Sequence, residues 1–270
     1  MNPVEGKYST IHYQEYLKLG KLLDAQELRS VQSQAPAHEE MLFIIVHQVY
    51  ELWFKQILHE VDHVTQLLDQ DHLADALGTL RRILTILKTV VNQIDILETM
   101  TPLQFNSFRA FLANSSGFQS VQFRELEFAL GYKQKGMLTH FADDVHGIGQ
   151  LKARFQAPSL WDTFVHFLAR KKEGVPTAVL NRKVTEAIEP NQALQTILIE
   201  IYKNDPWLAR LCERLVDLDE GLMEWRYRHV KMVARTIGAK MGTGGSAGVK
   251  YLESTVKPVW PDLWTIRSEF

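Results

Sequence analysis

Residues 207–238 carry an apolar stripe with a histidine at its centre. Wound as a helix at about 100° per residue, Leu222, Trp225 and Val233 lie within about 60° of His229. A neutral imidazole in an apolar wall suits a haem iron ligand. More often, a histidine at such a position is a core residue whose ring N–H donates a hydrogen bond to a carbonyl. Spacing alone therefore leaves both interpretations open.

A second histidine occupies a similar position near the N-terminal third of the chain. His47 lies on one helical stripe with Phe43, Tyr50 and Phe54. Two helices that each present an apolar face and one histidine could enclose a flat macrocycle. Arg226 and Arg228 flank His229 and could meet the two propionates of a haem, although a solvated basic face explains them equally well.

Arg109 stands on an otherwise apolar helical face. Phe105 lies one turn before it, and Phe108 is adjacent. A buried guanidinium requires an anion, and its planar fork matches a carboxylate. The candidates are a carboxylate of a ligand and an intramolecular salt bridge.

The segment from His59 to His63 matches the H-E-x-x-H pattern of helical zinc proteases. Two histidines four residues apart on a helix can bind zinc, and Glu60 could activate water. The extended pattern fails because Gln66 stands where glycine is required. We therefore interpret this segment as an exposed helical face.

The glycine-rich segment 242–247 fits a loose dinucleotide-binding fingerprint. That fingerprint requires a strand before the glycines. A long helix is expected before this one, so we reject a nucleotide site.

Apolar spacings of three and four dominate the chain, whereas strict alternation is scarce. The pattern predicts an all-α protein, a single helical domain over residues 1–270 whose long antiparallel helices enclose the pocket. Thr101, Pro102 and Gln104 form a capping-box signature. Helices are expected over residues 39–68, 74–99, 101–113, 118–131, 159–172, 191–203 and 207–238.

The composition narrows the functional classes. The net charge of −2 shows no basic surplus for nucleic acid or an anionic membrane. No apolar run is long enough for a membrane span, and the first residues do not resemble a signal peptide. A single cysteine, Cys212, excludes an intrachain disulfide or a multi-cysteine metal site and suits the reducing cytoplasm.

Several blocks of the chain, in order from about residue 13 to residue 252, resemble the tryptophan 2,3-dioxygenase family. They are Phe43–Gln48, Tyr50–Lys55, Leu97–Pro102, Phe105–Arg109, Ser115–Ser120, Trp225–His229 and Gly242–Gly248. Agreement of several independent blocks is far more specific than either short pattern above.

The resemblance implies roles for particular residues around a haem b. His229 would be the proximal iron ligand, and His47 would hydrogen-bond the indole N–H on the distal side. Arg109 would hold the substrate carboxylate, and Thr243 in the glycine-rich loop would hold the ammonium group. The remaining substrate-binding residues implied are Phe43, Phe105, Ser116, Gly117, Tyr13, Tyr16 and Leu17.

The resemblance also implies an activity and an assembly. The expected reaction is cleavage of the indole C2–C3 bond of L-tryptophan by O2 to give N-formyl-L-kynurenine, the first step of the kynurenine route. The expected assembly is a homotetramer, a dimer of dimers, in which the N-terminal arm, residues 1–37, reaches a neighbouring subunit. An indole is already nucleophilic, so we expect His47 to orient the substrate.

Two departures from the family pattern leave alternatives open. Phe105 stands where some members carry Tyr, and Ile94 stands where an aromatic residue is expected near the haem. The second change keeps open a haem oxygenase acting on a substituted tryptophan, with one oxygen inserted to give an oxindole. A non-catalytic haem carrier or sensor is a further alternative, although it makes little use of Arg109 or Thr243.

Overall fold

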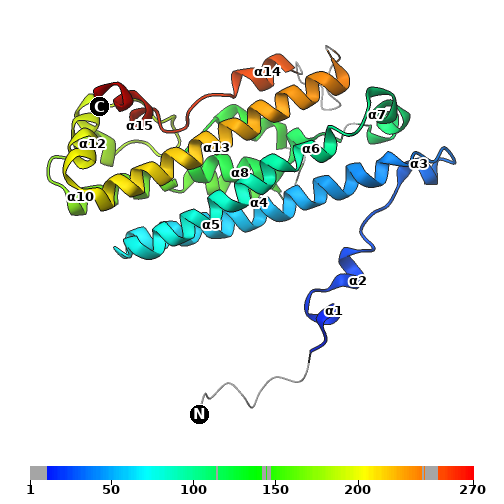
Figure 1. Ribbon diagram of the computed structural model, residues 1–270, viewed down its shortest axis with the longest axis horizontal. Coiled ribbons are helices and arrows are strands. Elements are labelled where there is room, and N and C mark those ends of the chain that lie inside the picture. The colour runs from blue at the N-terminus through cyan, green and yellow to red at the C-terminus, as the bar shows by residue number, and fades with distance from the viewer. Residues whose placement is uncertain (1–10, 114, 142–143, 145–146, 239, 241–248) are drawn as a thin grey trace.

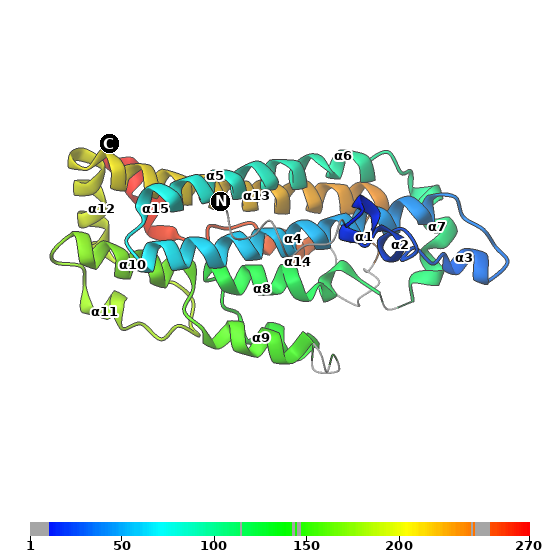
Figure 2. The ribbon, with the colours of Figure 1, turned by 90° about the horizontal axis from the view of Figure 1, so that it is seen from below.

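A computed structural model describes residues 11–113, 115–141, 144, 147–238, 240 and 249–270, and all regular structure in this part is helical. The prediction of an all-α protein is therefore confirmed. Three long helices form the body: α4 (Glu39–Asp69), α5 (Leu73–Asn92) and α13 (Pro206–Ile237). Figures 1 and 2 show α4 running antiparallel to both α5 and α13, with α8 (Val121–Leu130) and then α9 (Gly147–Gln156) on the other side of α4.

The remaining helices are shorter and surround this body. They are α1 (Tyr13–Tyr16), α2 (Leu19–Leu22), α3 (Arg29–Gln32), α6 (Ile94–Leu97), α7 (Pro102–Arg109), α10 (Leu160–Lys171), α11 (Thr177–Leu180), α12 (Gln192–Asn204), α14 (Val249–Ser254) and α15 (Pro261–Thr265). No helix in the described ranges combines the length and apolar character needed to cross a membrane.

Local capping residues decide where several helices begin. The predicted capping box is present at α7, where Thr101 Oγ1 accepts a hydrogen bond from Gln104 N at 3.3 Å. Ser159 and Asp162 form a second box at α10, and Asp205 accepts from Leu208 N at 3.1 Å at α13. Each cap satisfies an amide that has no partner inside its helix.

Two predicted helices differ from the structure in detail. The predicted helix 74–99 is divided at Gln93 into α5 and α6. The predicted helix 118–131 begins instead at Val121, because Ser120 Oγ accepts a hydrogen bond from Phe123 N at 3.1 Å. Gly131 ends α8 with φ 113°, and a Cβ there would lie 2.6 Å from Ile188 Cδ1. Glycine satisfies both requirements at this position.

The C-terminal tail is fastened to α13 by a buried carboxylate. Asp219 accepts hydrogen bonds from Val259 N at 2.9 Å, Trp260 N at 3.1 Å and Trp264 Nε1 at 3.0 Å. Trp260 is fully buried, and its indole N–H donates to Leu130 O at 2.9 Å. These contacts fix the end of α8 against α13, and both helices contribute to the cavity described below.

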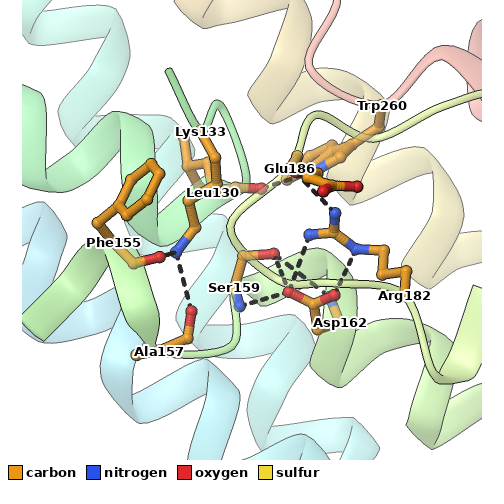
Figure 3. A network of polar contacts seen from close by, with 9 residues as sticks. All are labelled: Leu130, Lys133, Phe155, Ala157, Ser159, Asp162, Arg182, Glu186 and Trp260. Atoms are coloured by element: carbon orange, nitrogen blue, oxygen red, sulfur yellow. Dashed lines mark hydrogen bonds and ion pairs between the residues drawn. The ribbon is translucent and has the colours of Figure 1, made fainter. Parts of the chain in front are cut away.

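A second buried network joins α10 to the segment that follows α11 (Figure 3). Asp162 accepts from Arg182 Nε at 2.6 Å and Nη2 at 3.1 Å, and also from Ser159. Nearby, Lys133 Nζ donates to the carbonyls of Arg154, Phe155 and Ala157 at the end of α9. The fork geometry makes Asp162 the anchor for the loop carrying Arg182.

Replacement of Asp162 with alanine is expected to lower the free energy of unfolding by about 3–5 kcal/mol, because it leaves the mostly buried Arg182 without its carboxylate and removes the acceptor of Ser159 N in the α10 capping box. Urea denaturation measures this change. Lys183→Ala is the matched control, since its pair with Glu186 is exposed and contributes at most about 1 kcal/mol. Equal effects of the two substitutions would contradict this account of the network.

Candidate functional site

A cavity of about 540 Å³ lies among α4, α7, α8, α13, α14 and the segment 115–120. This volume is within the usual range for sites that enclose a small molecule or cofactor. The cavity brings together residues that are far apart in the sequence. Those predicted from the sequence and found in its wall are Phe43, His47, Phe105, Arg109, Ser116, Gly117 and His229.

His229 lines this cavity from α13. The Trp225 ring lies parallel to the His229 ring, with 5.2 Å between centroids and 5° between planes. Burial lowers the pKa of His229 to about 4, and the charge of His47 adds a smaller effect in the same direction. The imidazole is therefore neutral at pH 7, and within the described ranges it has no hydrogen-bond partner. A neutral imidazole without a carbonyl partner, in the wall of a cavity, is available to a metal ion.

His47 lines the cavity from α4 and has a defined tautomer. Its Nδ1 lies 2.7 Å from Phe43 O, and a carbonyl oxygen can only accept. Nδ1 therefore carries the proton, and Nε2 is an acceptor. Burial lowers the pKa of His47, although the Phe43 hydrogen bond and the charge of Glu51 oppose this effect. A neutral His47 can accept a hydrogen bond from an N–H group of a ligand.

An aromatic wall lies beside His47. The Phe43 ring is 4.1 Å from the imidazole, 6.0 Å from Phe105 and 5.4 Å from Phe108, measured between centroids. Phe108 is completely buried behind the wall, whereas Phe43 and Phe105 line the cavity. Such a wall suits a flat aromatic ligand.

Arg109 and the segment 115–120 supply the polar part of the wall. Arg109 ends α7 and lines the cavity, so a guanidinium stands beside the aromatic residues. Ser116 Oγ accepts a hydrogen bond from Phe118 N at 3.3 Å, which fixes the turn. A Cβ at Gly117 would meet nothing within 4 Å, so the bare backbone faces open space. The cavity thus combines a cation, an aromatic face and two neutral histidines.

Comparison with known proteins identifies the family of this chain. A family model described as tryptophan 2,3-dioxygenase matches residues 3–148 and 167–270. The chain belongs to the tryptophan 2,3-dioxygenase family. Its relatives include a tryptophan 2,3-dioxygenase of Herpetosiphon aurantiacus, 55% identical over 95% of this chain and 97% of the relative. A tryptophan 2,3-dioxygenase of Anaeromyxobacter dehalogenans is 50% identical over 96% of this chain and 96% of the relative. One of an Arthrobacter species is 42% identical over 97% of this chain and 92% of the relative.

The cavity of this dioxygenase family member fits a haem. The neutral His229 offers an available nitrogen, and apolar side chains from α4 and α13 line the same space. Two buried cations, Arg124 and Arg226, also line it, and Arg124 Nε has no partner in the described part of the chain. A macrocycle with an apolar body and anionic edges matches this distribution.

Three predicted site residues lie elsewhere. Tyr13, Tyr16 and Leu17 are 72%, 74% and 42% exposed and do not line the cavity of this chain. They belong to an arm that projects from the helical body (Figure 1) and is attached to α4 where Gln48 Nε2 donates to Ala25 O at 2.9 Å. Thr243 lies outside the described residues.

Ile94 does not occupy the position that the family pattern suggested. Its side chain is 1% exposed and packs in the main hydrophobic core from α6. It is absent from the cavity wall, to which Leu97 and Met100 contribute instead. Ile94 therefore does not contact the cavity directly, because α6 turns this side chain towards the core.

Sequence reasoning missed three charged wall residues, Glu51 of α4 and Arg124 and Glu127 of α8. It also grouped Arg226 with Arg228, but only Arg226 lines the cavity. Arg228 instead pairs with Asp95 and Glu98 at 2.5 and 3.5 Å. The sequence did offer one signal for this group: Arg124 and Glu127 are three residues apart on a predicted helix, and Arg226 lies next to the apolar stripe of His229. Only the tertiary structure reveals that these residues of α8 and α13 meet, through the ion pair of Glu127 with Arg226.

Among the described residues, the H-E-x-x-H segment lacks the arrangement of a metal site. His59 and His63 are exposed, whereas Glu60 is buried and accepts from Arg82 Nη1 at 2.8 Å and from Gln56. No group of three potential ligands gathers among the residues that the structure describes. The interpretation as an exposed face is confirmed for the two histidines.

His59→Ala is expected to leave dioxygenase activity and zinc content unchanged, because the side chain is exposed on α4 and does not line the cavity. Steady-state assay and metal analysis of the purified variant measure both quantities. A large loss of activity with loss of bound zinc would show that the pattern is a real metal site.

The haem-free protein is expected to lose stability as the pH falls from about 6.5 towards 4. Both His47 and His229 have folded-state pKa values below the unfolded value, so the unfolded chain binds protons first on acidification. The stabilising contribution is complete above pH 6.5. Urea titrations from pH 4 to 8 test this expectation, and His229→Phe should flatten the profile. An identical profile for that variant would contradict it.

Proposed function

We propose that this protein cleaves the indole C2–C3 bond of L-tryptophan with O2 to give N-formyl-L-kynurenine. Family membership over nearly the whole chain supports this activity. The structural observation that best supports it is a single cavity lined by the neutral His229 and His47, by an aromatic wall and by Arg109. Both oxygen atoms enter the product, so the reaction needs no external reductant.

His229 would hold a haem b as its proximal ligand. A ferrous haem in this position supplies the activation of dioxygen for the reaction. The low pKa keeps the His229 nitrogen available as a ligand down to mildly acidic pH. The apolar residues around it, including Trp225 and Val233, limit the access of water.

His47 would position the indole ring. Because Phe43 O fixes the proton on Nδ1, Nε2 accepts the indole N–H and sets the ring in one orientation. Phe43 and Phe105 would contact the faces of the ring, while Ser116 and Gly117 would lie beside the reacting atoms. Orientation is the main contribution of these residues, since the indole is already electron-rich.

Arg109 would bind the substrate carboxylate, and Thr243 would hold the ammonium group. A guanidinium next to an aromatic wall matches an amino acid with an aromatic side chain. With Ile94 in the core, nothing in the described part of the chain favours a substituted tryptophan over tryptophan itself.

The arm would complete the site of a neighbouring subunit. Tyr13, Tyr16 and Leu17 place exposed apolar surface on a projecting segment, which is unusual for a monomer. We assign a homotetramer, a dimer of dimers, with these residues against the partner's pocket. The single buried cysteine, Cys212, suits a cytoplasmic enzyme.

The test is a spectrum followed by an assay. Purified protein is examined for a haem band, reduced, and supplied with L-tryptophan and O2 while N-formylkynurenine absorbance is recorded. A haem band with product formation is expected. A haem band without product from L-tryptophan or its substituted analogues would identify a haem carrier or sensor. A colourless protein that takes up no added haem would overturn the proposal.

A further inference from the structure

A buried ion-pair cluster, Arg124–Glu127–Arg226, lines the cavity where α8 meets α13. Glu127 accepts one hydrogen bond from Arg124 and another from Arg226 Nη2 at 2.6 Å. Arg226 Nη1 also donates to Thr255 O at 2.8 Å. The exposed fractions of the three side chains are 6%, 2% and 3%, in chain order.

The cluster holds one more positive charge than negative charge. Two guanidiniums share one carboxylate, and the Nε of Arg124 has no partner in the described ranges. Asp219 acts on Arg226 from outside the cluster, but its oxygens already accept three N–H groups of the C-terminal tail. An uncompensated buried charge is costly, so this wall favours an anion.

The cluster lies close to the proposed iron ligand, His229, so an anion bound by it would be near the iron. Arg226 lies one turn before His229 on α13, and both side chains line the cavity. Arg228, on a different side of the helix, pairs with Asp95 and Glu98 and does not reach the cavity. Arg109 reaches the same cavity from α7, a separate element.

We propose that Arg124 and Arg226 bind one propionate carboxylate of the haem, while Glu127, which bridges them, balances part of their positive charge. This inference rests on the haem site of the proposed function. It separates two carboxylate sites in one cavity: Arg124 and Arg226 for the cofactor, and Arg109 for the amino acid. The cluster thereby fixes the rotation of the macrocycle about the bond to His229.

The test measures haem affinity and needs no turnover. Apoprotein of the wild type and of the Arg124→Gln, Glu127→Gln and Arg228→Gln variants is titrated with haem and with haem dimethyl ester, whose two carboxylates are blocked. The Soret absorbance reports binding, and transfer to apomyoglobin reports the dissociation rate. Helical circular dichroism checks the fold of each variant.

Arg124→Gln should weaken haem binding by about tenfold or more, as loss of a charge-assisted hydrogen bond predicts, and should change ester binding little. Glu127→Gln should slow haem dissociation, because it raises the positive charge facing the propionate. Arg228→Gln should match the wild type. Equal losses with haem and ester, or faster haem dissociation from Glu127→Gln, would overturn the inference even if Arg124→Gln does not fold.

A second comparison distinguishes the two carboxylate sources. In the ferric holoprotein, Arg124→Gln should preserve the preference for L-tryptophan over tryptamine, which lacks a carboxylate. Loss of that preference would assign the cluster to the substrate and overturn the inference. If the wild type binds neither haem nor its ester, the proposed function itself is wrong.

Discussion

Replacing His229 with alanine is expected to abolish haem retention and, with it, all dioxygenase activity. His229 is the residue of the cavity whose imidazole is neutral and has no hydrogen-bond partner in the described part of the chain. The remaining wall offers apolar contacts and the cations Arg124 and Arg226, none of which can replace the protein ligand of the iron. The Soret band of the purified variant and its haem-to-protein ratio measure the loss.

Addition of imidazole provides the control for this prediction. The alanine variant leaves space where the ring stood, so free imidazole should restore a haem band in the variant and change the wild type little. His59→Ala, which alters an exposed histidine of α4, should retain a full complement of haem. Full haem retention by the His229 variant, with an unaltered spectrum, would transfer the ligand role to another residue.

Replacing Arg109 with alanine is expected to reduce kcat/KM for L-tryptophan by a factor corresponding to about 2–5 kcal/mol, mostly through KM. The guanidinium lines the cavity at the end of α7 beside Phe105, where a carboxylate of an aromatic amino acid would lie. Its loss removes a charge-assisted, two-pronged contact. Steady-state kinetics at saturating O2 measure the effect.

Tryptamine tests the same contact from the ligand side. Because tryptamine lacks the carboxylate, its binding should be nearly insensitive to the Arg109 substitution. The losses of binding free energy from removing the carboxylate and from removing the guanidinium should therefore not be additive. Arg109→Lys keeps the charge but loses the fork, so it should fall between wild type and alanine. Additive losses with tryptamine, or an unchanged KM for L-tryptophan, would contradict the assignment.

The main helices were predictable because their apolar period and caps are local properties. α4, α10, α12 and α13 agree with the sequence pattern to within a few residues, as does the capping box of α7. The break at Gln93 was not predicted, since the periodic pattern continues through it. Nor was the 3₁₀ turn at 117–119, which depends on side chains of the turn itself.

Individual residues show where sequence patterns reach their limit. Ile94 matched a position that the family pattern placed near the haem, yet α6 directs it into the core. Arg226 and Arg228 looked equivalent along α13, but one faces Glu127 in the cavity wall and the other faces α6. These differences depend on which neighbouring helices pack against each side chain, and the sequence of one segment does not contain that information.

The sequence alone determined the helical fold and the family, and it singled out His229 as a candidate ligand on an apolar stripe. It left that histidine undecided between a core position and an iron ligand. Tertiary structure decided the surroundings of this histidine: His229 faces a cavity, has no hydrogen-bond partner in the described ranges, and shares the space with His47 and Arg109, which supports the ligand role proposed above. Burial and partnership depend on what packs opposite a residue, whereas spacing along the chain fixes only the face on which it lies.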